Sequence, residues 1–144
     1  VVRDLEAAFE KEGLSEYEIV AVDNGSKAKT AELLKDLHRK NPRVKIVTVP
    51  VNQGLGYGIL QGFKNAEGDY VGFNPGDGQI GPEDVLKVWR KINQEDLDLC
   101  KVNRVVRQDG LNRKIVSVAS DGQLPSLNGL GLFRRRDVNN TQSA

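Results

Sequence analysis

The sequence predicts an α/β fold in which a mostly parallel sheet is covered by helices. Three observations predict it. Short apolar runs rich in β-branched residues recur along the chain, segments with helical periodicity alternate with them, and Gly, Asn, Asp and Pro residues separate the two. With 144 residues, of which 38% are hydrophobic and 28% charged, the chain suits one ordinary soluble domain.

The expected elements follow in the order helix, strand, repeated four times. Helical spacing of apolar residues predicts helices over 2–9, 30–40, 59–63 and 85–92. Short runs of apolar and β-branched residues predict strands at Glu18–Val22, Val44–Val49, Tyr70–Phe73 and Leu97–Val102. Such an alternation is typical of parallel strands joined by crossover helices.

Turn residues mark the boundaries of these elements. Gly13 ends the first helix, and Asn41-Pro42 closes the second because a residue before proline avoids helical geometry. Pro82-Glu83-Asp84 suits the first turn of the fourth helix. After Arg107 turn signals dominate, so we expect irregular structure there. We expect one domain over residues 1–138 and a polar tail over 139–144.

Charge and cysteine usage exclude several classes of function. Twenty-one basic and twenty acidic residues leave a net charge of +1, so nucleic acid is not an expected partner. The lone Cys100 cannot form an internal disulfide. No apolar run approaches the length of a membrane span, and the N-terminal residues do not suit a signal peptide. These features predict a cytoplasmic protein.

The polar candidates for a functional site follow three predicted strands. They are Asp23, the loop over 52–58 and Asp77. Because ligands of open α/β sheets bind at the carboxyl ends of the strands, we expect these segments to meet at one edge. Gly54 and Gly56 would let the backbone approach a phosphate or ribose at a helix N-terminus. Asp77 could hold Mg²⁺ or Mn²⁺ together with substrate phosphate oxygens.

Each candidate also has a simpler interpretation. The stretch from Asp23 to Ser26 suits a strand-to-helix turn, and Asp77 among glycines suits a turn of its own. The series Gly54, Gly56, Gly58 resembles the start of a dinucleotide-binding fingerprint but lacks its later glycine. An unrelated dinucleotide-binding α/β domain therefore stays an alternative.

Taken in order, the motifs resemble a known family. "YEIVAVDNGSKAKTAELL", "VPVNQGLGYGILQGFKNAEGDYVGFNPGDGQIGPEDV" and "VNRVVRQDG" resemble the inverting GT-A nucleotide-sugar glycosyltransferases of family two, especially the polyprenyl-phosphate (dolichol-phosphate) sugar transferases. The segment "LNGLGLFRRRDV" is similar to a later stretch of that family. The resemblance implies a GT-A-like, Rossmann-like three-layer sandwich.

The resemblance also implies roles for individual residues. Asp23 and Asn24 would contact the base and ribose of a nucleotide-diphosphate sugar, and Asp77 would hold the metal on its diphosphate. Gln79 follows Asp77 as in the family. Three arginines are similar to those that meet donor or acceptor phosphates: Arg104, Arg107 and Arg113. The implied reaction transfers the sugar with inversion to a polyprenyl phosphate or another acceptor, at a membrane surface.

The sequence departs from the family's pattern at defined positions. Pro75 replaces the first Asp of the Asp-x-Asp motif, Asn24 replaces the second Asp of Asp-Asp-Gly-Ser, and Ala28 stands where a further Asp is usual. Fewer carboxylates predict a weakly held Mg²⁺ or Mn²⁺. A non-catalytic binding or assembly module is therefore an alternative function.

The family's opening strand is absent from this sequence. We expect either that the sequence is incomplete at its N-terminus, or that another strand, a second copy of the chain or another partner supplies the missing pairing.

Overall fold

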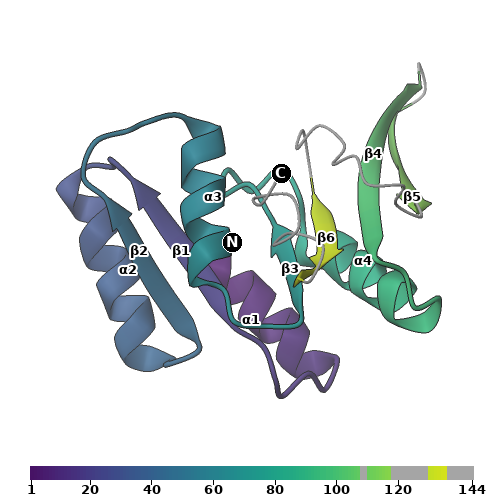
Figure 1. The fold of residues 1–144 in the computed structure, drawn as a ribbon, viewed down its shortest axis with the longest axis horizontal. Coiled ribbons are helices and arrows are strands. Elements are labelled where there is room, and N and C mark those ends of the chain that lie inside the picture. Colours follow the sequence, from purple (N-terminus) through teal and green to yellow (C-terminus); the bar gives the residue numbers. More distant parts are fainter. Residues whose placement is uncertain (108–109, 118–129, 136–144) are drawn as a thin grey trace. The chain divides into compact units, whose positions relative to one another are not determined.

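The computed structural model describes residues 1–107, 110–117 and 130–135 (Figure 1). These residues form two compact units. One consists of residues 15–68, and the other consists of residues 1–14 together with the described residues from 69 onward. In the described part no helix is long and apolar enough to cross a membrane.

The unit of residues 15–68 is built on two parallel strands. Strand β1 (Ile19–Asn24) pairs with β2 (Val44–Val49) in a register that runs from Ile19 opposite Val44 to Asn24 opposite Val49. Helix α2 (Ala28–Lys40) packs mainly on β2, and α3 (Leu55–Asn65) packs mainly on β1. Both strands therefore end at the same edge, where each is followed by a loop that leads into a helix (Figure 1).

The other unit contains a four-stranded sheet with the order β3-β6-β4-β5. Its strands are β3 (Tyr70–Phe73), β4 (Leu99–Arg107), β5 (Gly110–Ser117) and β6 (Gly131–Arg134), and every neighbouring pair is antiparallel. Its helices are α1 (Val2–Lys11) and α4 (Pro82–Gln94). The core under α4 consists of Ile80, Val88, Ile92, Cys100, Val102 and Leu130.

The predicted α/β class is confirmed. The four expected helices correspond to α1–α4, and the four expected strands correspond to β1–β4. β1 and β2 are parallel as expected. β3 and β4 also run in the same direction, but they do not pair directly because β6 lies between them and is antiparallel to both.

The expectation of irregular structure after Arg107 was wrong for residues 110–117 and 131–134, which form β5 and β6. Glycines hid the second of these strands. Where β6 crosses β3, a Cβ on Gly72 would lie 2.8 Å from Cδ1 of Leu132. On β6 itself, a Cβ at Gly131 would lie 3.2 Å from the ring of Phe133, so glycine stands where a side chain would normally signal a strand. The predicted polar tail lies outside the described residues, and the single domain over 1–138 stays a prediction.

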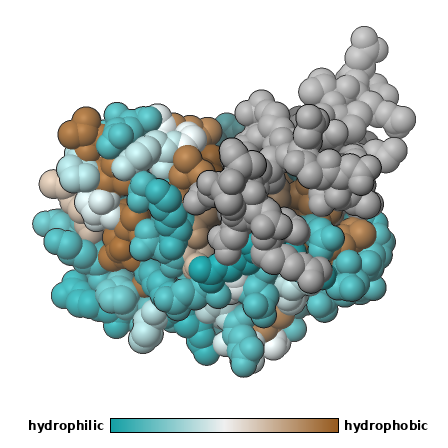
Figure 2. Space-filling model, in the orientation of Figure 1, coloured by the Kyte–Doolittle hydropathy of each residue, from teal (hydrophilic) through white to brown (hydrophobic). Residues whose placement is uncertain are grey.

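Apolar side chains are not confined to the core. The face in Figure 2 shows hydrophobic patches interspersed with hydrophilic ones. In the unit of residues 15–68 the large exposed apolar side chains are Leu33, Val51, Leu55, Tyr57 and Leu60. Val51 and Leu55 flank the glycine loop after β2, so part of this apolar surface adjoins the candidate site.

Candidate functional site

The end of β1 is held by a buried carboxylate. Asp23 is 5% exposed, and its Oδ1 accepts a hydrogen bond of 2.9 Å from the backbone N–H of Ser26. This is the turn that an Asp favours after a strand, because the side chain replaces a backbone acceptor. The simpler interpretation of Asp23 is thus confirmed, whereas its predicted contact with a nucleotide stays a prediction.

Asn24 joins the loop after β1 to the loop after β2. Its Nδ2 donates to the carbonyl oxygen of Gly54 at 2.9 Å and to Oδ1 of Asn52 at 3.3 Å. Its Oδ1 accepts a longer bond of 3.4 Å from the backbone N–H of Gln53. Both the nitrogen and the oxygen of this amide are therefore hydrogen-bonded within the protein. Asn24 thus fixes the loop over 52–54 next to the end of β1. A direct contact with the base or ribose stays a prediction.

The two loops approach each other closely at Gly25. This residue has φ +72°, and a Cβ built on it would lie 2.5 Å from the backbone nitrogen of Asn52. Such a distance leaves no room for any side chain. Asn52 in turn accepts a bond of 2.8 Å at its Oδ1 from the backbone N–H of Gly54. The predicted meeting of the first two segments at one sheet edge is thus confirmed.

The first turn of α3 has open surroundings. Gly54 caps this helix, and no side chain caps the first-turn N–H groups. A Cβ on Gly56 would meet nothing within 4 Å, so the backbone is accessible there. Helix N-termini of this kind favour anions because their N–H groups and dipole carry partial positive charge. The predicted role of Gly54 and Gly56 in binding a nucleotide is compatible with this arrangement and stays a prediction.

The end of β3, in the other unit, carries the remaining candidates. Asp77 is exposed in a turn, and its Oδ1 accepts a bond of 2.9 Å from the backbone N–H of Gln79, which is also exposed. Three residues earlier, Asn74 has both of its side-chain polar atoms buried without a hydrogen-bond partner in the described part of the chain. Leaving such a group unpaired costs about 1–3 kcal/mol.

The residues around Asp77 fit a divalent cation only as a site with few protein ligands. Among the described residues no group of three or more His, Cys, Asp or Glu side chains could hold a metal ion. Asp77 offers a hard carboxylate oxygen and Asn74 an unpaired amide oxygen, while Pro75 offers no side-chain ligand. Mg²⁺ is commonly bound through one or two carboxylates, waters and substrate phosphates, so the residues present match that mode.

The three predicted arginines all lie on the β4–β5 hairpin. Arg104 and Arg113 are register partners in the β4–β5 hairpin, and Arg107 is the register partner of Gly110. The hairpin thus brings two of the predicted positions together across one strand pair.

Arg134, on β6, has its guanidinium engaged by other side chains of the protein. Its guanidinium pairs with Asp96 and Asp98, donates to the hydroxyl of Tyr70 at 2.9 Å and lies over the ring of Tyr70. Its pKa is raised by these contacts, first by the Asp96 carboxylate. Arg134 therefore has a structural role.

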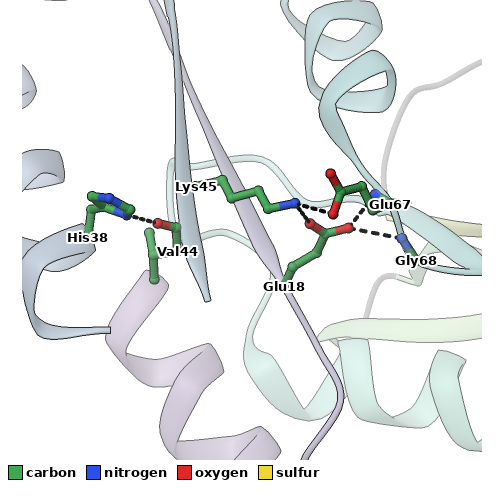
Figure 3. A network of polar contacts seen from close by, with 6 residues as sticks. All are labelled: Glu18, His38, Val44, Lys45, Glu67 and Gly68. Atoms are coloured by element: carbon green, nitrogen blue, oxygen red, sulfur yellow. Dashed lines mark hydrogen bonds and ion pairs between the residues drawn. The ribbon is translucent and has the colours of Figure 1, made fainter. Parts of the chain in front are cut away.

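A second polar cluster lies at the opposite end of the β1–β2 sheet (Figure 3). The ammonium group of Lys45 pairs with the carboxylates of Glu18 and Glu67, each at 2.8 Å. Glu18 also accepts hydrogen bonds from the backbone N–H groups of Glu67 and Gly68. Nearby, Nδ1 of His38 donates to the carbonyl oxygen of Val44 at 2.6 Å.

The contacts in the cluster change the pKa values of Glu18 and Lys45. Burial raises the pKa of the Glu18 carboxyl, but the hydrogen bonds from Lys45 and from the backbone outweigh it, so the pKa lies below the ordinary 4.5. The carboxylates of Glu18 and Glu67 raise the pKa of Lys45 above the ordinary 10.5. Glu18 and Lys45 are therefore charged around neutral pH, and the cluster fixes the start of both strands to the end of the loop after α3.

Two residues were not singled out from the sequence, namely Asn52, which lies within the predicted loop over 52–58, and Asn74. Asn52 stands in an Asn-x-Gly sequence, which is a recognisable turn signal. Asn74 precedes Pro75, which is also a turn signal, but only the fold reveals that its amide is buried and unpaired.

Comparison with known proteins decides the family. The family model described as "Glycosyl transferase family 2" matches residues 2–140. The chain belongs to glycosyl transferase family 2. This family 2 chain is 30% identical over 121 residues to the undecaprenyl-phosphate 4-deoxy-4-formamido-L-arabinose transferase of Photorhabdus laumondii, a match that covers 83% of the chain and 37% of the relative.

Other relatives have similar names. The family 2 chain is 35% identical over 103 residues to the transferase of the same name from Pectobacterium atrosepticum, covering 70% of the chain and 31% of the relative. It is 33% identical over 80 residues to an uncharacterized glycosyltransferase of Haemophilus influenzae, covering 56% of the chain and 32% of that protein. The family 2 chain thus spans about a third of the length of the curated relatives it matches. The resemblance noted in the sequence is confirmed.

Proposed function

We propose that this chain is the donor-binding part of a glycosyltransferase that moves a sugar from a nucleotide-diphosphate sugar to a polyprenyl phosphate. The observation that carries the proposal is the match of the family 2 model over residues 2–140. Relatives named as undecaprenyl-phosphate sugar transferases support the acceptor class.

The strand ends supply the binding chemistry in this proposal. The loop that Asn24 fixes presents the open first turn of α3, which suits an anionic or polar part of the nucleotide. Asp77, at the end of β3 in the other unit, would hold Mg²⁺ or Mn²⁺ on a diphosphate. A bound cation would neutralise the negative charge that develops on the departing diphosphate.

The acceptor phosphate needs little activation in this proposal. It is already anionic near neutral pH, so no general base has to remove a proton before it attacks the sugar carbon. Attack from the side opposite the leaving diphosphate would invert the configuration at that carbon. Arg104 and Arg113, which are register partners in the β4–β5 hairpin, are the proposed cationic residues that would meet donor or acceptor phosphates.

A thermal-shift screen tests the donor-binding part. Uridine and guanosine diphosphate sugars are added with Mn²⁺ or with a chelator, and the melting temperature is followed. We expect at least one sugar nucleotide with Mn²⁺ to raise the melting temperature. Asp77→Asn should remove the rise while keeping an oxygen that accepts from the N–H of Gln79. Asp4→Asn, an exposed change on α1 of the same unit, should leave it intact. No shift with any sugar nucleotide would argue against the proposal.

A non-catalytic binding module is the second candidate, and Pro75 favours it because a carboxylate is lost beside Asp77. Transfer of radiolabelled sugar to undecaprenyl phosphate, or hydrolysis of the donor, decides between the two. Turnover that Asp77→Asn abolishes excludes the module. A nucleotide-dependent thermal shift without any turnover supports it.

A further inference from the structure

The amide of Asn74 is the least explained polar group at the end of β3. Both its Nδ2 and its Oδ1 are buried, and neither has a hydrogen-bond partner in the described part of the chain. Asn74 directly follows β3 and precedes the turn that contains Asp77. Native structures pair nearly all buried polar groups, so an unpaired one at the edge of a candidate site points to a ligand or a bound water.

The chemistry of the amide narrows the choice of ligand. Its oxygen is a hard, neutral donor of the type that Mg²⁺ and Mn²⁺ accept alongside carboxylates. Position 75, where a second carboxylate could have served the cation, holds proline. The loop from Asn74 to Gln79 therefore offers one charged oxygen ligand at Asp77 and one neutral oxygen ligand at Asn74.

We propose that the Oδ1 of Asn74 is a ligand of the divalent cation that accompanies the nucleotide diphosphate, in partnership with Asp77. This inference rests on the proposed donor-binding function and goes beyond it by naming a second protein ligand. A neutral ligand in place of a carboxylate weakens the affinity for the free cation. The cation then binds mainly together with the diphosphate, which supplies the missing negative charge.

Two substitutions at this position separate the interpretations. Asn74→Leu removes the amide but keeps a similar volume, and Asn74→Asp keeps the oxygen and adds a charge. Asn93→Leu and Asn93→Asp serve as matched controls, because Asn93 is an exposed residue on α4 of the same unit. For each variant the melting temperature is measured alone and with Mn²⁺ plus uridine or guanosine diphosphate, and Mn²⁺ affinity is measured by titration calorimetry.

The two substitutions of Asn74 should change the affinity for Mn²⁺ in opposite directions. Asn74→Leu should raise the melting temperature of the unliganded protein by about 2–4 °C, because an unpaired buried amide is gone. It should also weaken Mn²⁺ binding in the presence of the diphosphate at least about tenfold. Asn74→Asp should strengthen Mn²⁺ binding by about tenfold, since ligand charge sets the affinity. The Asn93 variants should change neither quantity.

Three outcomes would overturn the inference. If Asn74→Leu keeps the full Mn²⁺-dependent shift, the amide binds only water or has a purely structural role. If Asn74→Asp weakens binding, Nδ2 donating to a phosphate is the interaction that matters. In both cases a wild-type shift leaves the donor-binding function standing. If the wild type shows no shift with either diphosphate, both proposals fall together.

Discussion

The Nδ2 of Asn24, at the end of β1, donates a hydrogen bond of 2.9 Å to the carbonyl oxygen of Gly54, at the cap of α3. One side chain thus fixes the distance between two strand-end loops that are separated by 30 residues in the sequence. Replacing Asn24 with Ala removes this bond and the weaker ones to Asn52 and Gln53.

We expect Asn24→Ala to lower the free energy of unfolding by about 1–2 kcal/mol, measured by urea denaturation. We also expect faster hydrogen exchange at the backbone N–H of Gln53 in this variant, because that group loses its acceptor on Asn24. Asn65→Ala is the matched control, since its Nδ2 bonds only to Gln61 on the same helix in the bonds that the structure describes. If both variants lose the same free energy of unfolding, the hydrogen bonds between the two loops do not stabilise the fold more than a bond within one helix.

The contact between Gly25 and Asn52 leads to a second prediction. Gly25 and Gly13 both have positive φ, +72° and +78°, but only at Gly25 would a Cβ meet another atom closer than 3 Å. We expect Gly13→Ala to cost about 1 kcal/mol and Gly25→Ala clearly more, because the loop over 52–54 must also move. Thermal unfolding of the two variants measures the difference. If they lose equal stability, the loops are not packed as closely as described.

The cluster of Glu18, Lys45 and Glu67 predicts a dependence of stability on pH. The pKa of Glu18 is lowered in the folded protein, so its contribution is present above the ordinary 4.5 and is lost as pH falls through the folded value. Glu18→Gln should therefore be less stable than the wild type at pH 7, and the difference should shrink below about pH 4.5. Urea denaturation across this range measures it. Glu32→Gln, an exposed change on α2, is the control.

Lys45 contributes at the other end of the pH scale. Its pKa is raised above 10.5, so its stabilisation is present below that value and is lost as pH rises through the folded pKa. For the low-pH prediction, a stability difference between Glu18→Gln and wild type that stays constant from pH 3 to pH 7 would contradict the role given to Glu18 in the cluster.

Cys100 gives a fourth prediction. It is the single cysteine of the chain, its side chain is fully buried in β4, and burial raises the pKa of its thiol above the ordinary 9.0. Because only the exposed thiolate reacts, modification by a disulfide reagent at pH 8 should be at least about a hundredfold slower than in urea. Rapid reaction without denaturant would show that the core under α4 opens readily.

The sequence was most informative where one physical signal dominated. The runs Glu18–Val22 and Val44–Val49 are apolar and β-branched because both strands are covered by helices, and they form β1 and β2. The strand β6 could not be predicted in the same way. Gly131 on β6 makes room for the ring of Phe133, and Gly72 on β3 makes room for its register partner Leu132, so residues that permit this pairing are poor strand formers.

The candidate site was predictable by position more than by role. Asp23, Asn24 and Gly54 lie together because parallel strands end at one edge, and that rule needs no side-chain detail. The sequence could not say that the amide of Asn24 is used within the protein, or that the amide of Asn74 is left over. Both facts depend on distances between segments that only the folded chain sets.

Trp89 packs edge-on against Tyr70, with ring centroids 5.6 Å apart and planes at 82°. It is the only tryptophan in the sequence, and it belongs to the unit that contains α4. Tryptophan fluorescence, excited at a wavelength that tyrosine does not absorb, therefore follows this unit alone, whereas far-ultraviolet circular dichroism follows both. A spectroscopist can thus learn, without adding any label, whether the two parts of the molecule melt in one transition or in two.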